Sequence, residues 1–351
     1  MIRHDTLLKN ARDLADQRAE LRPSIVAIYV AGSVARGEPP FGGATDIDLI
    51  VVDNPSGGAL PEPEDVRLSS EIVAEITYRR PDFFRDTPAL RDHHYLGPEI
   101  AEGLALHDPR HFFERVQAGV RGRFDGPPHV FARARSSLEW ARGELDAILP
   151  WLETSRPESP TLDQIRRLAG ALQFAATAVL VLNRVPASIR RLMLRLSETA
   201  ETFGRPDLYS KFAHALNADS LTPDEVEALL SIWATLFDAA EEFHQSDWGE
   251  DFFIQPVRRN YCERAMKTLA AEGRERDTAW LLLHAGAACA NQIQLHAPPG
   301  AANLYFEKWQ RLLERFGLGS TADFAQAVGL ARDYLEAVSD FVDDWGVKEG
   351  A

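Results

Sequence analysis

The residues best suited to chemistry are two aspartates that alternate with apolar residues in an otherwise apolar segment. Asp46 and Asp48 open the run Asp-Ile-Asp-Leu-Ile-Val-Val, which has the length and composition of a β-strand. Successive side chains of a strand point to opposite faces of its sheet, so we expect the two carboxylates to share one face. At about 4 Å and an effective dielectric constant near 20, their repulsion is about 4 kcal/mol. A divalent cation would offset that repulsion, and Mg²⁺ prefers hard oxygen ligands together with phosphates.

A glycine–serine pair upstream offers groups that suit phosphates. Gly32 and Ser33 follow the β-branched apolar segment 24–30, which predicts a strand that ends in a turn. A glycine lets the backbone approach an anion closely, and a serine at such a turn offers its hydroxyl and backbone N–H groups. Arg36 follows one helical turn later and is a candidate to add positive charge. The pattern therefore predicts a metal site beside a phosphate site.

This arrangement resembles the signature of the polymerase-β-like nucleotidyltransferase superfamily. That signature is a Gly-Ser or Gly-Gly pair, a spacer of about a dozen residues, and a strand that reads Asp-apolar-Asp-apolar. The chain has the pair at residues 32 and 33, a spacer of twelve residues, and Asp-Ile-Asp-Leu from residue 46. Arg36-Gly37 follows the pair, and Thr45 stands where serine commonly precedes the first aspartate. The resemblance covers residues 20–118.

The resemblance also implies a third carboxylate on a neighbouring strand. Glu75 is the best candidate, because it lies within the strand-like segment 72–78. Glu71 stands next to that segment and is the nearest competitor. The connection before it is rich in proline and glycine, and the conformation of residues 65–70 stays open.

The resemblance implies an enzyme that transfers a nucleoside monophosphate, AMP from ATP, to a hydroxyl group. It implies three catalytic carboxylates that ligate two Mg²⁺ ions, namely Asp46, Asp48 and Glu75. It also implies three nucleotide-binding residues, namely Gly32, Ser33 and Arg36. With a single ion bound, Glu75 would instead act as the general base. Two alternatives stay open, namely transfer of AMP to a protein, as in toxin–antitoxin or regulatory systems, and a nucleotidyltransferase fold that binds without catalysis.

The histidines and cysteines give weaker signals. His93-His94 and His107-Asp108 have no partner at a spacing typical of metal ligands, so we interpret these histidines as structural or exposed. Cys262 and Cys289 lie far apart and outside any Cys-x-x-Cys pattern, which favours packed thiols over nucleophiles.

The elements that must position these residues predict an α+β fold. We assign residues 1–118 to a nucleotidyltransferase domain, with a mixed sheet and flanking helices, and the glycine- and proline-rich residues 119–130 to a linker. Beyond it, apolar residues recur with a period near 3.6, which predicts a helical bundle over 131–246 and a further helical subregion over 247–351. Within the bundle, Thr222-Pro223-Asp224-Glu225 is a capping box with proline at the first helical position.

A helical bundle after the catalytic domain is also how the antibiotic-modifying nucleotidyltransferases are arranged. That similarity implies a small-molecule acceptor, aminoglycoside-like in character. The net charge of −15 and the lack of a basic arm disfavour nucleic acid as a partner and favour a cationic or small molecule.

Composition and the N-terminal residues bear on the compartment. The first residues contain no apolar run of the kind that a signal peptide needs, and the apolar segment 279–290 is too short to span a bilayer. With only two cysteines in 351 residues, we expect a cytoplasmic protein without a membrane partner. The oligomeric state stays open, and a homo-oligomer is compatible with the sequence.

Overall fold

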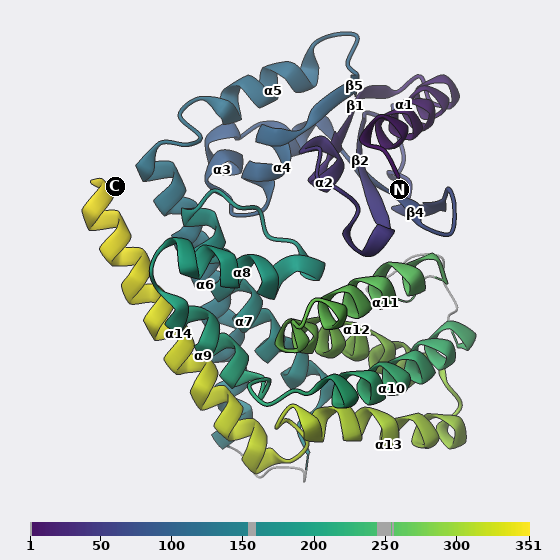
Figure 1. Cartoon of the computed structure of the whole chain (residues 1–351). Helices are drawn as coiled ribbons and strands as arrows, with labels where there is room; N and C mark the ends of the chain where they lie inside the picture. The colour runs from purple at the N-terminus through teal and green to yellow at the C-terminus, as the bar shows by residue number, and fades with distance from the viewer. Residues whose placement is uncertain (1, 154–158, 244–253, 255) are drawn as a thin grey trace. The chain divides into compact units, whose positions relative to one another are not determined.

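The chain folds into two compact units. The structure is a computed structural model that describes residues 2–153, 159–243, 254 and 256–351. Among these, residues 2–129 form the first unit, and the remaining residues, from 130 onward, form the second. The first contains a five-stranded sheet, and the second is built from helices (Figure 1). The predicted α+β fold class is therefore confirmed.

The first unit has a mixed sheet with the strand order β3-β4-β2-β1-β5. The strands are β1 (Ile25–Ala31), β2 (Thr45–Asp53), β3 (Glu64–Arg67), β4 (Ile72–Arg79) and β5 (Leu104–His107). The helices are α1 (His4–Leu21), α2 (Gly32–Ala35), α3 (Thr87–Asp92), α4 (Leu96–Glu102) and α5 (Phe112–Arg121), with the 3-10 turns η1 (Phe41–Gly43) and η2 (Pro81–Phe84). Strands β2 and β4 are parallel, and the other neighbouring strands are antiparallel.

Side-chain alternation divides the core of this unit into two layers. On one face of the sheet, Leu49 and Val51 pack in a cluster with Leu7 of α1. On the other face, Ile50 packs in a cluster with Ile100 of α4 and residues of α3 and α5. Figure 1 shows α1 on one side of the strands and α3, α4 and α5 on the other. Burying each large apolar side chain contributes roughly 1.5–3 kcal/mol, so both layers hold the sheet in place.

The described residues of the second unit form helices and contain no strand. The helices are α6 (Pro127–Glu153), which begins just before the boundary between the units, α7 (Leu162–Leu182), η3 (Ile189–Arg191), α8 (Leu192–Thr202), α9 (Pro206–Ala215), α10 (Pro223–Glu242), α11 (Pro256–Ala271), α12 (Glu275–His296), α13 (Pro299–Arg315) and α14 (Thr321–Glu349). The capping box predicted at Thr222 is confirmed, because the side chains of Thr222 and Glu225 each bond the other's backbone N–H. Residues 119–130, predicted as a linker, include the end of α5 and the start of α6.

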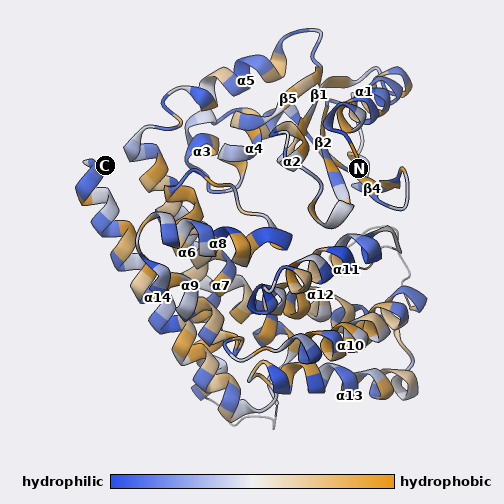
Figure 2. Cartoon of the chain, in the orientation of Figure 1, coloured by the Kyte–Doolittle hydropathy of each residue, from blue (hydrophilic) through white to orange (hydrophobic). Residues whose placement is uncertain are grey.

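Helix α7 lies in the interior of the second unit. It packs against α8, α12 and α14. In the described part of the chain it is the one helix long and apolar enough to cross a membrane, but 72% of its most apolar window is buried inside the structure. Figure 2 shows blue and orange segments alternating along the helices of this unit, as expected for amphipathic helices that bury one face. We therefore interpret α7 as a core helix.

Candidate metal and phosphate site

The two aspartates lie on one face of β2, as the alternation predicts. Ile47 and Leu49 are 0% and 1% exposed and belong to the core layer beneath α1. Asp46 and Asp48 are half-buried and point to the opposite face. That face is covered further along β2 by the helices that pack on Ile50, so the acids occupy the end of the strand that these helices leave partly open.

Glu75 lies beside Asp48 because β4 runs parallel to β2. The pairing places Asp48 opposite Glu75 and Asp46 opposite Val73. One carboxylate oxygen from each of Asp46, Asp48 and Glu75 lies within 4.8 Å of the other two. In the described part of the chain this is the one such group of three or more His, Cys, Asp or Glu side chains. The register thus brings Glu75, which is distant in sequence, beside the two aspartates.

The competing carboxylate, Glu71, is not part of this group. Its backbone carbonyl accepts a hydrogen bond from Thr45 N at 2.9 Å, at the start of β2. Its side chain accepts a hydrogen bond from Ser69 Oγ at 3.3 Å. Glu71 therefore stabilises the turn before β4, and the geometry favours Glu75 as the third acid.

The chemistry of this donor set suits Mg²⁺. Three carboxylates offer hard, charged oxygen atoms, and the group contains neither sulfur nor imidazole. Mg²⁺ is typically held by one or two protein carboxylates, and its remaining positions are filled by water and substrate phosphates. Asp46, Asp48 and Glu75 would be the residues that hold such an ion.

Gly32 forms the wall of the site next to Asp48. It follows β1 directly, and Ala31, the residue before it, pairs with Asp48 across the sheet. Its φ is +65°, a conformation that L residues rarely adopt. A Cβ at this position would lie 1.7 Å from Asp48 Oδ2. The turn therefore requires glycine for its backbone conformation and for the space that the carboxylate occupies.

Ser33 and Arg36 follow Gly32 but differ in their surroundings. Ser33 is half-buried at the start of the four-residue helix α2. Arg36 Nε donates to Glu38 Oε1 at 2.6 Å, and Arg36 NH1 donates to Glu102 Oε2 of α4 at 3.1 Å. Burial opposes the charge of the guanidinium, but the hydrogen bonds and charges of Glu38 and Glu102 outweigh burial and raise the pKa of Arg36. The structure thus shows Arg36 tying α2 to α4, and its role in nucleotide binding stays a prediction.

A buried polar network on the same face of the sheet as the acids was not predicted from the sequence. Glu99 Oε2 of α4 accepts a hydrogen bond from Arg79 NH2 at 2.8 Å. Glu99 Oε1 accepts one from the Tyr29 hydroxyl at 2.8 Å and another from Arg79 NH1. Arg79 lies four residues after Glu75 on β4, and therefore on the same face of the sheet. Burial opposes the charge of Arg79, but the Glu99 carboxylate outweighs it and raises the pKa of Arg79. In the sequence, the one sign of this network was a charged residue, Arg79, four positions after Glu75 in a strand-like segment.

The histidines take structural positions. His93 Nδ1 accepts hydrogen bonds from the backbone N–H groups of Tyr95 and Leu96 at 3.1 and 3.2 Å, so it caps the start of α4. The His94 ring stacks on His93 with ring centroids 4.6 Å apart. Burial, and secondarily the charge of His93, lowers the pKa of His94 to about 4. His94 is therefore neutral at physiological pH.

The other sequence signals are also structural. Asp108 accepts hydrogen bonds from the backbone N–H groups of Phe112 and Glu114 at 2.7 and 3.0 Å, which anchors the start of α5. Cys262 and Cys289 are both buried thiols that are not joined in a disulfide. The prediction that they are packed thiols is confirmed.

Comparison of the chain with models of known protein families found no match, and a search of curated proteins found none either. The geometry of the acids and the glycine turn, together with the resemblance of their motif, is therefore what points to a function.

Proposed function

We propose that the chain is a Mg²⁺-dependent nucleotidyltransferase that moves AMP from ATP to a hydroxyl group of a small-molecule acceptor. The observation that carries the proposal is the joint placement of three carboxylates within 4.8 Å of one another and of Gly32 against Asp48. Carboxylates at this spacing accumulate negative charge, and a triphosphate would add more. Only a cation between them makes that combination favourable.

The site residues would have two roles, to bind the metal ion and to bind the departing phosphates. Asp46 and Asp48 would hold Mg²⁺ against the phosphates. Gly32 and Ser33 would bind the departing phosphates through backbone N–H groups and the serine hydroxyl, since no side chain at residue 32 stands in the way. Bound Mg²⁺ neutralises charge on the attacking and leaving oxygens of an in-line displacement.

The transfer itself forms one bond and breaks one. The acceptor oxygen bonds to the α-phosphorus of ATP, the bond between the α-phosphorus and its bridging oxygen to the β-phosphate breaks, and pyrophosphate leaves. Glu75 lies on the side of the acids away from β1, where it can accept the proton of the hydroxyl or hold a second ion. The helical second unit and the net charge of −15 support a small, cationic acceptor, such as an aminoglycoside-like polyol.

Calorimetric titration of the full chain with ATP tests the proposal. We expect binding that requires Mg²⁺, and pyrophosphate release when a panel of hydroxylated acceptors is added. Asp48→Asn should abolish the release. Glu71→Gln is the matched control, because this carboxylate precedes the same strand as Glu75 but lies outside the group of three; it should behave as the wild type.

Three outcomes would count against the proposal or redirect it. Turnover by Asp48→Asn at the wild-type rate would refute the role of the acids. Absence of any Mg²⁺-dependent nucleotide binding would favour the inactive scaffold. Label transferred from the α-phosphate of ATP to a polypeptide in a cell lysate would favour protein adenylylation.

A further inference from the structure

The turn that carries Gly32 and Ser33 is tethered to the first residue of helix α1. His4 Nε2 lies 2.8 Å from the backbone carbonyl oxygen of Val34, which follows Ser33 in α2. A carbonyl oxygen only accepts hydrogen bonds, so the proton lies on Nε2 and the ring donates it. Thirty residues separate the two partners, and helices α1 and α2 pack against each other (Figure 1). The bond therefore joins the turn to an element outside it.

Helix α2 depends on such outside contacts for its orientation. It contains only the four residues 32–35, and a single helical turn is marginal by itself. The Val34 side chain is 0% exposed and packs in the same apolar cluster as Leu7 of α1. Apolar packing holds α2 near α1 but has no direction, whereas a hydrogen bond requires alignment of donor and acceptor. The His4 bond is therefore a contact that fixes how α2 is turned against α1.

The two ends of α2 meet different neighbours. Gly32, its first residue, lies against Asp48, since a Cβ there would be 1.7 Å from Asp48 Oδ2. Val34, its third residue, is held by His4. Ser33 lies between them in the chain, so its position depends on both contacts. A misplacement of about 1 Å in a group that positions a substrate can cost about a hundredfold in rate.

We propose that His4 is a positioning residue for the triphosphate, and that it acts through the Val34 carbonyl and not by direct contact. The hydrogen bond keeps Gly32 and Ser33 where they bind the departing phosphates, so this role rests on the proposed function. In the part of the chain that the structure describes, the group of three carboxylates that would hold a metal ion contains no histidine. Loss of the His4 bond should therefore weaken phosphate binding and leave metal binding unchanged. General damage to the first unit would instead weaken both, because it would move the acids as well.

Two substitutions separate the hydrogen bond from the size of the side chain. His4→Gln keeps an N–H donor on a side chain of similar length, and His4→Met keeps the length without a donor. Inorganic tripolyphosphate, titrated calorimetrically in Mg²⁺, measures phosphate binding without a base or an acceptor. Mn²⁺ alone, followed by electron paramagnetic resonance, measures the metal site, because carboxylates suit Mn²⁺ as they suit Mg²⁺.

We expect His4→Met to weaken tripolyphosphate binding about tenfold, since one hydrogen bond is lost, and to bind Mn²⁺ as the wild type does. His4→Gln should bind both probes as the wild type does. His214→Met is the control for loss of a histidine hydrogen bond elsewhere. His214 lies in α9 of the second unit and pairs with Asp219 at 2.8 Å through an exposed side chain, and its loss should change neither measurement.

Three results would overturn the inference and leave the proposed function standing. The first is unchanged tripolyphosphate binding in His4→Met. The second is equal weakening of tripolyphosphate and Mn²⁺ binding in that variant, and the third is equal loss of tripolyphosphate binding in His4→Gln and His4→Met. If the wild type does not bind tripolyphosphate in Mg²⁺, the phosphate site of the proposed function itself fails.

Discussion

The side chain of Asp48 occupies the space that the absent side chain of Gly32 leaves. A Cβ on residue 32 would lie 1.7 Å from Asp48 Oδ2 and 2.9 Å from Asp48 Cγ. The two residues are neighbours because β1 and β2 are antiparallel and Ala31 pairs with Asp48. The glycine turn and the strand that carries the candidate metal ligands are therefore one structural unit, and a change at residue 32 should displace the Asp48 carboxylate.

We expect Gly32→Ala to destabilise the protein and to abolish Mg²⁺-dependent ATP binding. A φ of +65° costs an L residue about 1–2 kcal/mol, and the added methyl group must also displace the Asp48 carboxylate. Thermal unfolding measures the first effect and calorimetric titration the second. Gly37→Ala is the matched control. The φ of Gly37 is also positive, at +72°, but a Cβ at residue 37 would lie 3.9 Å from its nearest neighbours, two atoms of the His4 ring. This variant should lose stability and keep binding; equal loss of binding in both variants would contradict the argument.

Arg36 allows its two candidate roles to be separated. We expect Arg36→Gln to weaken ATP binding and to lower the Tm, because the variant removes a positive charge and leaves the Glu102 carboxylate without this ion pair. Adding Glu102→Gln should recover part of the Tm, since that carboxylate is no longer charged, but should not restore ATP binding. Restoration of both by the double variant would show that Arg36 acts only by holding α2 against α4.

Arg79 should matter for stability through Glu99. The Arg79 and Glu99 side chains are 14% and 6% exposed, so Arg79→Ala would leave a buried carboxylate without its counter-ion. Removing one partner of a buried ion pair costs about 3–5 kcal/mol. Tyr29→Phe keeps the ion pair and removes two hydrogen bonds, the one that Tyr29 donates to Glu99 and the one that it accepts from Arg79 NH1 at 3.3 Å, and should cost about 1–2 kcal/mol. Urea unfolding of the two variants compares these costs, and equal destabilisation would show that the charge of Arg79 contributes little.

The parts of the site that follow local rules could be predicted from the sequence. The period of two along β2 places Asp46 and Asp48 on one face, and the glycine after β1 marks a turn. Glu75 was the best candidate, by its strand-like surroundings, for the third carboxylate that the resemblance implies, and the parallel register places it opposite Asp48. For the aspartates and the glycine turn, neighbouring residues contain the information.

The parts that depend on distant pairs could not be predicted. Arg36 and Glu102 are separated by 66 residues, and Tyr29 and Glu99 by 70. No periodicity links such residues, because their contact depends on how α4 packs on the sheet. The short strand β3 also lay in a segment whose composition left its conformation open, and it forms by pairing with β4.

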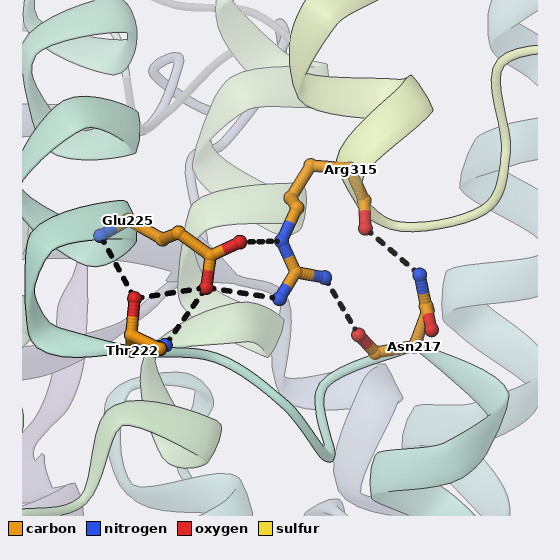
Figure 3. Close-up of polar contacts among 4 residues, drawn as sticks. All are labelled: Asn217, Thr222, Glu225 and Arg315. Atoms are coloured by element: carbon orange, nitrogen blue, oxygen red, sulfur yellow. Dashed lines mark hydrogen bonds and ion pairs between the residues drawn. The ribbon is translucent and has the colours of Figure 1, made fainter.

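The second unit shows the same division between local and distant contacts (Figure 3). Glu225 completes the capping box with Thr222, and the sequence predicts this local contact. Glu225 also accepts a hydrogen bond from Arg315 Nε of α13 at 2.8 Å, and the sequence does not predict this distant contact. Arg315 NH1 in turn donates to the backbone carbonyl of Asn217 at 2.9 Å. One carboxylate thus joins the start of α10 to the end of α13.

This network should make stability depend on pH. The hydrogen bond from Arg315, and then those from Thr222, lower the pKa of Glu225 to about 2 from its ordinary value of 4.5. Because the pKa is lower in the folded protein, the carboxylate stabilises the fold fully above pH 4.5, and the contribution is lost as the pH falls towards 2. We expect the Tm of Glu225→Gln to lie below that of the wild type near neutral pH, and the difference to shrink through this window. Glu227→Gln, an exposed carboxylate on the same helix, is the control and should show no such trend. A Tm difference for Glu225→Gln that stays constant down to pH 2 would mean that packing, and not the charge of Glu225, joins the two helices.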